Sequence, residues 1–132
     1  MYLLDTNICT LVIRGRPNKL IDRLLAQPSD ELGFSILTLS ELAYLVAKSR
    51  TPAKSQQALE LFLTAVQVLE YSAEAALLCG RLRADLERNG TSPSASDLMI
   101  AAQALTSGCT LVSNKPGQYR RIRGLDVENW AR

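Results

Sequence analysis

The sequence predicts an α/β protein, a three-layer α/β/α sandwich with a central, mainly parallel sheet. Short apolar runs typical of buried strands alternate along the chain with longer segments whose apolar residues recur at helical spacing. This alternation favours parallel pairing, because right-handed crossovers place helices on both faces of a sheet. The 132 residues have the usual size of one domain and show no repeat or linker, so we expect a single domain over residues 1–132.

Each element is expected from apolar spacing and from capping or turn residues at its ends. Strands are expected at residues 2–6, 32–36, 66–69, 109–112 and 125–127. Helices are expected at residues 7–13, from 17 to the Pro28 break, from 38 to the break at 50–52, from 53, from the Ser72 cap to Asn89, and at 98–105. Thr38-Leu39-Ser40-Glu41 matches a capping box, which would place Glu41 in the first turn of the third helix. Near the C-terminus, Trp130 is expected to be exposed.

The composition limits the available chemistry. Histidine is absent, which excludes imidazole general bases, Ser-His-Asp and Cys-His nucleophiles, and histidine-ligated zinc. The three cysteines, Cys9, Cys79 and Cys109, are far apart among apolar residues, as expected of free thiols in a reducing compartment. We find no signal segment and no apolar run of membrane length, so we expect a cytoplasmic protein. The formal net charge of +2 permits a nucleic-acid partner without requiring one.

Three carboxylates stand at junctions of the predicted elements. Asp5 ends the first strand, Glu41 begins the third helix, and Asp97 follows a polar loop and opens another helix. Each also has a purely structural explanation: Asp5 suits an N-cap, Glu41 completes the capping box, and Asp97 is favoured by the helix dipole. Taken singly, Asp5 is more readily explained as a helix cap than as a catalytic acid.

The three acids are expected to meet, because ligands of open α/β sheets bind beyond the carboxyl ends of the strands. Carboxylates gathered there repel one another unless a hard divalent cation neutralises them, and Mg²⁺ or Mn²⁺ suits such oxygen ligands. A cation of this kind leaves positions for a phosphate oxygen and for an acidified water. The spacing therefore modestly favours metal-dependent phosphodiester hydrolysis over three unrelated helix caps.

Several segments, in this order, resemble the motifs of PIN-domain proteins. They are Leu3-Leu4-Asp5-Thr6-Asn7, Thr38-Leu39-Ser40-Glu41-Leu42, Asp97-Leu98-Met99-Ile100-Ala101-Ala102 and Thr110-Leu111-Val112-Ser113-Asn114. The ending Gly124-Leu125-Asp126-Val127-Glu128-Asn129-Trp130 is similar to that of the VapC toxins within the family. The resemblance spans the whole chain.

This resemblance implies a Mg²⁺- or Mn²⁺-dependent endoribonuclease, the toxin of a type II toxin–antitoxin pair, that cuts structured RNA with tRNA as the leading substrate class. Asp5, Glu41 and Asp97 fall on the family's catalytic, metal-binding acids, with Glu41 acting directly or through water. Secondary site residues are Thr6, Asn7, Ser113, Asn114 and Gln118. Implied partners are a VapB-like antitoxin that covers the active site and a second copy of the chain; no membrane partner is implied.

The chain departs from the family pattern at Gln118, which aligns with a further acid in many relatives. A neutral amide contributes no charge, so a second metal ion should bind less well there. The departure keeps open an alternative function: a PIN-like RNA-binding or antitoxin-binding module without turnover. A phosphatase with Asp5 as nucleophile is a weaker alternative, because such enzymes carry a second acid where this chain has Asn7.

Overall fold

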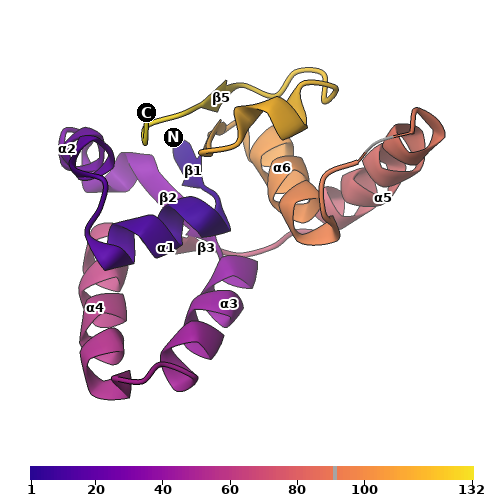
Figure 1. Ribbon diagram of the computed structural model, residues 1–132. Helices are drawn as coiled ribbons and strands as arrows, with labels where there is room; N and C mark the ends of the chain where they lie inside the picture. Colours follow the sequence, from indigo (N-terminus) through magenta and orange to yellow (C-terminus); the bar gives the residue numbers. More distant parts are fainter. Residues whose placement is uncertain (91) are drawn as a thin grey trace.

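The computed structural model describes residues 1–90 and 92–132 (Figure 1). Within these residues, five strands form one sheet in the order β3-β2-β1-β4-β5, and every neighbouring pair is parallel. Their bounds are β1 Tyr2–Leu4, β2 Leu32–Ser35, β3 Gln67–Leu69, β4 Thr110–Val112 and β5 Val127–Glu128. The expected parallel sheet is therefore confirmed, with β1 at its centre.

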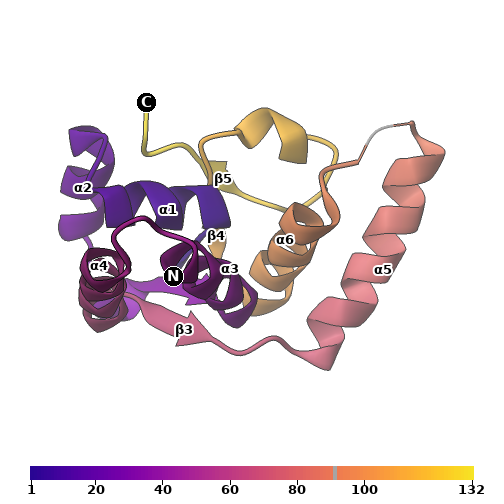
Figure 2. The ribbon, with the colours of Figure 1, turned by 60° about the horizontal axis from the view of Figure 1, so that its bottom comes forward.

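Helices cover both faces of the sheet (Figures 1 and 2). The α-helices are α1 Thr6–Arg14, α2 Asn18–Leu25, α3 Ile36–Ala47, α4 Pro52–Ala65, α5 Ala73–Arg88 and α6 Ala95–Ser107, and the 3₁₀ turns are η1 Ser29–Glu31 and η2 Pro116–Tyr119. Buried residues of α1 to α4 join one hydrophobic cluster, and those of α5 and α6 join a second. The predicted three-layer sandwich is thus confirmed.

The central strand β1 contributes side chains to both helical layers. Leu3 belongs to the cluster under α5 and α6, whereas Leu4 belongs to the cluster under α1 to α4, and both are fully buried. This alternation follows from the two-residue period of a strand. Asp5 comes next, and its backbone N–H donates to the Val112 carbonyl at 3.0 Å, so its position at the carboxyl edge is fixed by the sheet itself.

The expected start of the third helix is wrong. Helix α3 begins at Ile36 directly after β2, and the Ser35 hydroxyl accepts the Leu37 N–H at 3.1 Å as its N-cap. Thr38 is buried and its hydroxyl lies 2.9 Å from that of Thr6 on α1, so it serves helix packing rather than capping. Glu41 consequently lies in the second turn of α3.

The expected exposure of Trp130 is also wrong, because its side chain is only 1% exposed. Its ring meets the edge of Tyr2 with ring centroids 4.8 Å apart, and the guanidinium of Arg23 lies 5.0 Å from its ring centroid. Its indole N–H donates to Glu128 at 3.0 Å, which satisfies the one polar atom of the ring. The chain end is therefore packed against β1 and α2.

The expectations for the cysteines and for helix α6 hold. The three cysteines are free thiols, with Cys9 and Cys109 buried. Helix α6 is buried on several sides, as its continuous apolar sequence predicts. In the described part of the chain, every helix is too short or too polar to cross a bilayer.

Candidate active site

Asp5 is both a helix cap and a buried acid. Its Oδ1 accepts the Ile8 N–H at 2.9 Å as the N-cap of α1, and the residue is 1% exposed. Burial raises the pKa of its carboxyl, and the charge of Asp97 raises it further, whereas the Ile8 N–H, the Ser113 hydroxyl and Lys115 lower it. The two explanations that the sequence left open for Asp5 are therefore compatible.

Asp97 lies in the first turn of α6 and is held by two side chains. Its Oδ2 accepts the Ser94 hydroxyl at 2.9 Å and the Gln118 amide at 3.3 Å. Ser94 also caps α6 by accepting the Asp97 N–H at 3.2 Å. These contacts fix the carboxylate and leave its Oδ1 outside the hydrogen bonds just described.

Asp5 and Asp97 come together, as predicted, from the end of β1 and the start of α6. In the described residues neither carboxylate forms an ion pair, and the charge of Asp97 contributes to the raised pKa of Asp5. Two neighbouring carboxylates with free oxygens are a donor set that hard divalent cations prefer. The residues present thus fit a Mg²⁺ or Mn²⁺ ion.

Glu41 is placed differently. Residues 1–90 and 92–132 contain no group of three Asp, Glu or Cys side chains gathered closely enough to hold one metal ion. Glu41 is exposed and lines a cavity of about 330 Å³ with Thr6, Thr38 and Ser96. Its predicted role in metal binding, directly or through water, therefore stays a prediction.

Four of the five secondary site residues lie in two pairs, and the fifth, Gln118, lies on η2. Ser113 and Asn114 follow β4. Ser113 is fully buried beside Asp5 and accepts the Lys115 N–H at 3.0 Å. Oδ1 of Asn114 is buried and has no hydrogen-bond partner in the described part of the chain. Thr6 and Asn7 begin α1, where Thr6 contacts Thr38 and Asn7 is exposed. Of the five, Gln118 donates a hydrogen bond to Asp97, and Ser113 lies near enough to Asp5 to lower its pKa.

Tyr119 is a site residue that the sequence did not reveal. It is 2% exposed, and its hydroxyl has no hydrogen-bond partner among residues 1–90 and 92–132. Burial, together with the charges of Asp97 and Asp5, strongly raises its pKa. The phenol therefore stays protonated next to the carboxylates. An aromatic residue in a turn is usually a core residue. The one sequence signal for Tyr119 is its place next to Gln118, which aligns with an acid in many relatives.

The fold and this acidic edge define a PIN-domain protein, and the family model of the PIN domain matches residues 2–124. The ribonuclease VapC2 of Rickettsia felis is 35% identical to the chain over 98% of each sequence. The tRNA(fMet)-specific endonuclease VapC of Salmonella typhimurium is also 35% identical, over 98% of this chain and 97% of its own. The chain therefore belongs to the VapC ribonucleases of the PIN-domain family.

Solved structures agree with this assignment. The DNA-bound VapBC of Salmonella typhimurium contains a chain with a TM-score of 0.90 and 34% identity, covering 98% of this chain and 97% of that one. The VapBC2 complex of Rickettsia felis with a promoter DNA fragment gives a TM-score of 0.89 at 34% identity, covering 98% of both chains. Both neighbours are DNA-bound VapBC complexes.

Proposed function

We propose that the chain is the toxin of a type II toxin–antitoxin pair, a divalent-metal-dependent endoribonuclease that hydrolyses phosphodiester bonds in structured RNA. The observation that carries the proposal is the pair of carboxylates, Asp5 and Asp97, at the carboxyl edge of the sheet in a VapC-family chain. The leading substrate class is tRNA, supported by the name of the Salmonella relative. A VapB-like antitoxin is the partner that the VapBC neighbours support.

The chain's own residues prepare the two acids for metal binding. The Ser94 hydroxyl and the Gln118 amide orient Asp97, and the Ile8 N–H orients Asp5. A Mg²⁺ or Mn²⁺ ion would be held by Asp5 and Asp97, with Glu41 reaching it through water. When bound, such an ion polarises the scissile phosphate and acidifies a water.

Tyr119 and Lys115 complete the surroundings of the pair. Because the Tyr119 phenol stays protonated, it can donate or accept a hydrogen bond there, and it adds no third negative charge. Lys115 is exposed but close enough to lower the pKa of Asp5, so it supports the ionised form that metal binding requires.

Cleavage of a total tRNA pool by the purified, antitoxin-free protein tests the proposal. We expect discrete cuts with Mg²⁺ or Mn²⁺ and none with chelator. Asp5→Asn and Asp97→Asn should each lower the rate about 100-fold or more, because charge stabilisation by a metal is worth several kcal/mol. Asp22→Asn, the same change at an exposed carboxylate of α2, is the matched control.

A wild type whose products equal those of Asp97→Asn, or that cuts equally well in chelator, would contradict the proposal. Retained RNA binding without cleavage would then favour the binding module that Gln118 kept open. A second copy of the chain, also expected from the resemblance, is tested separately by the mass of the purified protein in solution.

A further inference from the structure

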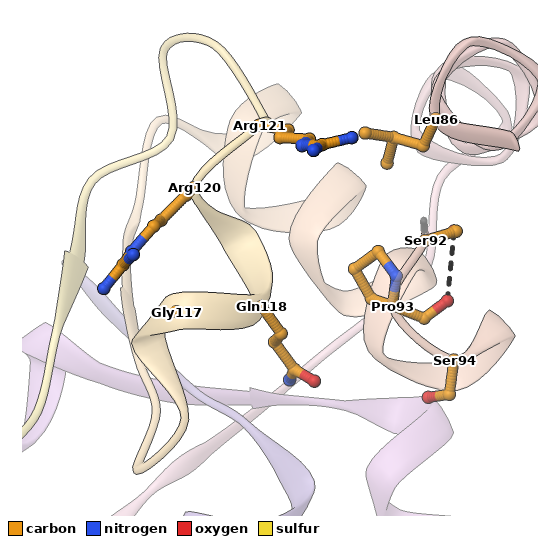
Figure 3. Close-up of a pocket in the computed structure, with 8 residues that line it drawn as sticks. All are labelled: Leu86, Ser92, Pro93, Ser94, Gly117, Gln118, Arg120 and Arg121. Carbon is orange, nitrogen blue, oxygen red and sulfur yellow. Dashed lines mark hydrogen bonds between the residues drawn. The ribbon is translucent and has the colours of Figure 1, made fainter. Parts of the chain in front are cut away.

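A cavity of about 410 Å³ lies beside Asp97, between the loop before α6 and the η2 turn (Figure 3). Its lining includes Leu86, Pro93, Ser94, Gln118, Arg120 and Arg121. Figure 3 shows Arg121 extending from the end of η2 toward Leu86 of α5, whereas Arg120 leaves the same turn on its other side. The cavity is separate from the one that Glu41 lines.

The cavity is linked to the acids through two shared side chains. Ser94 and Gln118 line it, and both donate to Oδ2 of Asp97, at 2.9 and 3.3 Å. A group bound in the cavity is therefore one side chain away from Asp97. A polymeric substrate whose reacting unit contacts Asp97 could therefore place a neighbouring unit in this cavity.

The charges of the two cavities differ in sign. The charged side chains that line this one are Arg120 and Arg121, and no carboxylate occurs in its described lining. The cavity on the α3 side carries the carboxylate of Glu41 and no cation among its described lining residues. An anion is thus favoured on the η2 side and repelled on the α3 side.

Arg121 is held in place before any ligand binds. Its Nη1 donates to the Asn89 carbonyl at 2.9 Å, which ties the η2 turn to the C-terminal end of α5. A guanidinium has five N–H donors, so this bond leaves others for a phosphate. A fixed guanidinium loses less conformational entropy on binding than a free one. The remaining polar lining, the Ser92 and Ser94 hydroxyls and the Gln118 amide, is neutral.

We propose that this cavity binds a backbone phosphate of the RNA, adjacent to the bond that is cut. The inference rests on the proposed ribonuclease function and assigns Arg121 as the residue that contacts the phosphate, with Gln118 keeping the cavity free of negative charge. The cavity lined by Glu41 would then take an uncharged part of the RNA, a base or a ribose.

The test measures binding without turnover. Fluorescently labelled initiator tRNA is titrated with the Asp5→Asn protein in chelator, at several salt concentrations. We expect Arg121→Gln to weaken binding about threefold to tenfold and to reduce the slope of log K against log salt by about 0.7 to 0.9, the loss of one phosphate contact. Gln118→Glu, which places a negative charge in the lining, should weaken binding by a similar factor.

Arg81→Gln is the matched control, since it removes the same charge from an exposed position of α5 outside the lining. If the melting temperature shows that Arg121→Gln disturbs the contact with α5, the affinity of Gln118→Glu for the tRNA tests the inference instead. Parental affinity in Gln118→Glu, or equal loss in Arg81→Gln, would overturn the inference. Absence of RNA binding by the parent would overturn it too, whereas RNA binding without cleavage by wild type would count only against the proposed function.

Discussion

Replacing Asp5 by Asn separates its role as a helix cap from its role as a buried charge. Asp5 accepts the Ile8 N–H at 2.9 Å, an Asn side chain can accept the same bond, and the two residue types are equally good N-caps. The substitution therefore removes only the charge. Because burial and Asp97 raise the pKa of Asp5, the ionised carboxyl is less stable in the folded chain than in the unfolded one.

The sign of the pH dependence follows from this raised pKa. An acid with a raised pKa in the folded state contributes stability at low pH that is lost as the pH rises through the folded-state pKa. In chelator, the free energy of unfolding of Asp5→Asn should therefore rise relative to that of wild type as the pH increases from 4 to 8. Asp5→Ala shares this gain but lacks the cap, which should make it about 1 kcal/mol less stable than Asp5→Asn at each pH. That difference corresponds to roughly 4 °C in melting temperature for a chain of this size.

Thermal and urea unfolding, followed by circular dichroism, measure these differences. Added Mg²⁺ should make wild type more stable than Asp5→Asn. A cation at ten times its dissociation constant stabilises wild type by about 1.4 kcal/mol, whereas the Asn variant lacks one of the carboxylate ligands. The predicted pH dependence is refuted if Asp5→Asn is no more stable than wild type at pH 8 in chelator. It also fails if the difference is the same at pH 4.

Three further predictions concern stability. In alkaline titrations followed by circular dichroism, Tyr119→Phe should unfold at a higher pH than wild type, because the raised pKa of Tyr119 makes its ionisation destabilising. At pH 7 the substitution should change the free energy of unfolding by only about 0.5 kcal/mol, because it removes no hydrogen bond of the described chain. Trp130→Ala should cost about 3–5 kcal/mol in urea unfolding, as expected for a buried aromatic, and an unchanged midpoint would mean that the chain end is not packed. Gly33→Ala should cost about 1–3 kcal/mol, because its Cβ would lie 2.8 Å from Cδ1 of Leu69, and adding Leu69→Ala should cancel part of the loss in a double-mutant cycle.

The sequence was sufficient for the sheet and for the aspartate pair because both depend on local signals. Apolar runs mark the strands, and parallel topology brings the end of β1 and the start of α6 to one edge. Asp5 and Asp97 could be located for this reason. The start of α3 could not, because Ser35 and Thr38 are both good caps, and the choice between them depends on where β2 stops pairing with β3.

Residues whose surroundings come from distant segments were the harder ones. Trp130 sits among polar neighbours in sequence, and its burial is provided by Tyr2 and Arg23, more than a hundred positions away. Glu41 has the residue type of a metal ligand, but its position on α3 keeps it out of a three-carboxylate group in the described chain. The hydroxyl of Tyr119 gains its significance only from the acids that it faces.

The alternation of Leu3 and Leu4 has a consequence for how far the acidic edge can vary. A one-residue slip of β1 would exchange the two buried leucines between the helical layers and move Asp5 away from the Ile8 N–H at the same time. The position of Asp5 and the packing of both hydrophobic clusters therefore depend on one three-residue strand. An insertion or deletion within residues 2–5 cannot change the geometry of the acids without unpacking the protein, so variants of this site with altered spacing should be lost as misfolded chains rather than recovered as weakened enzymes.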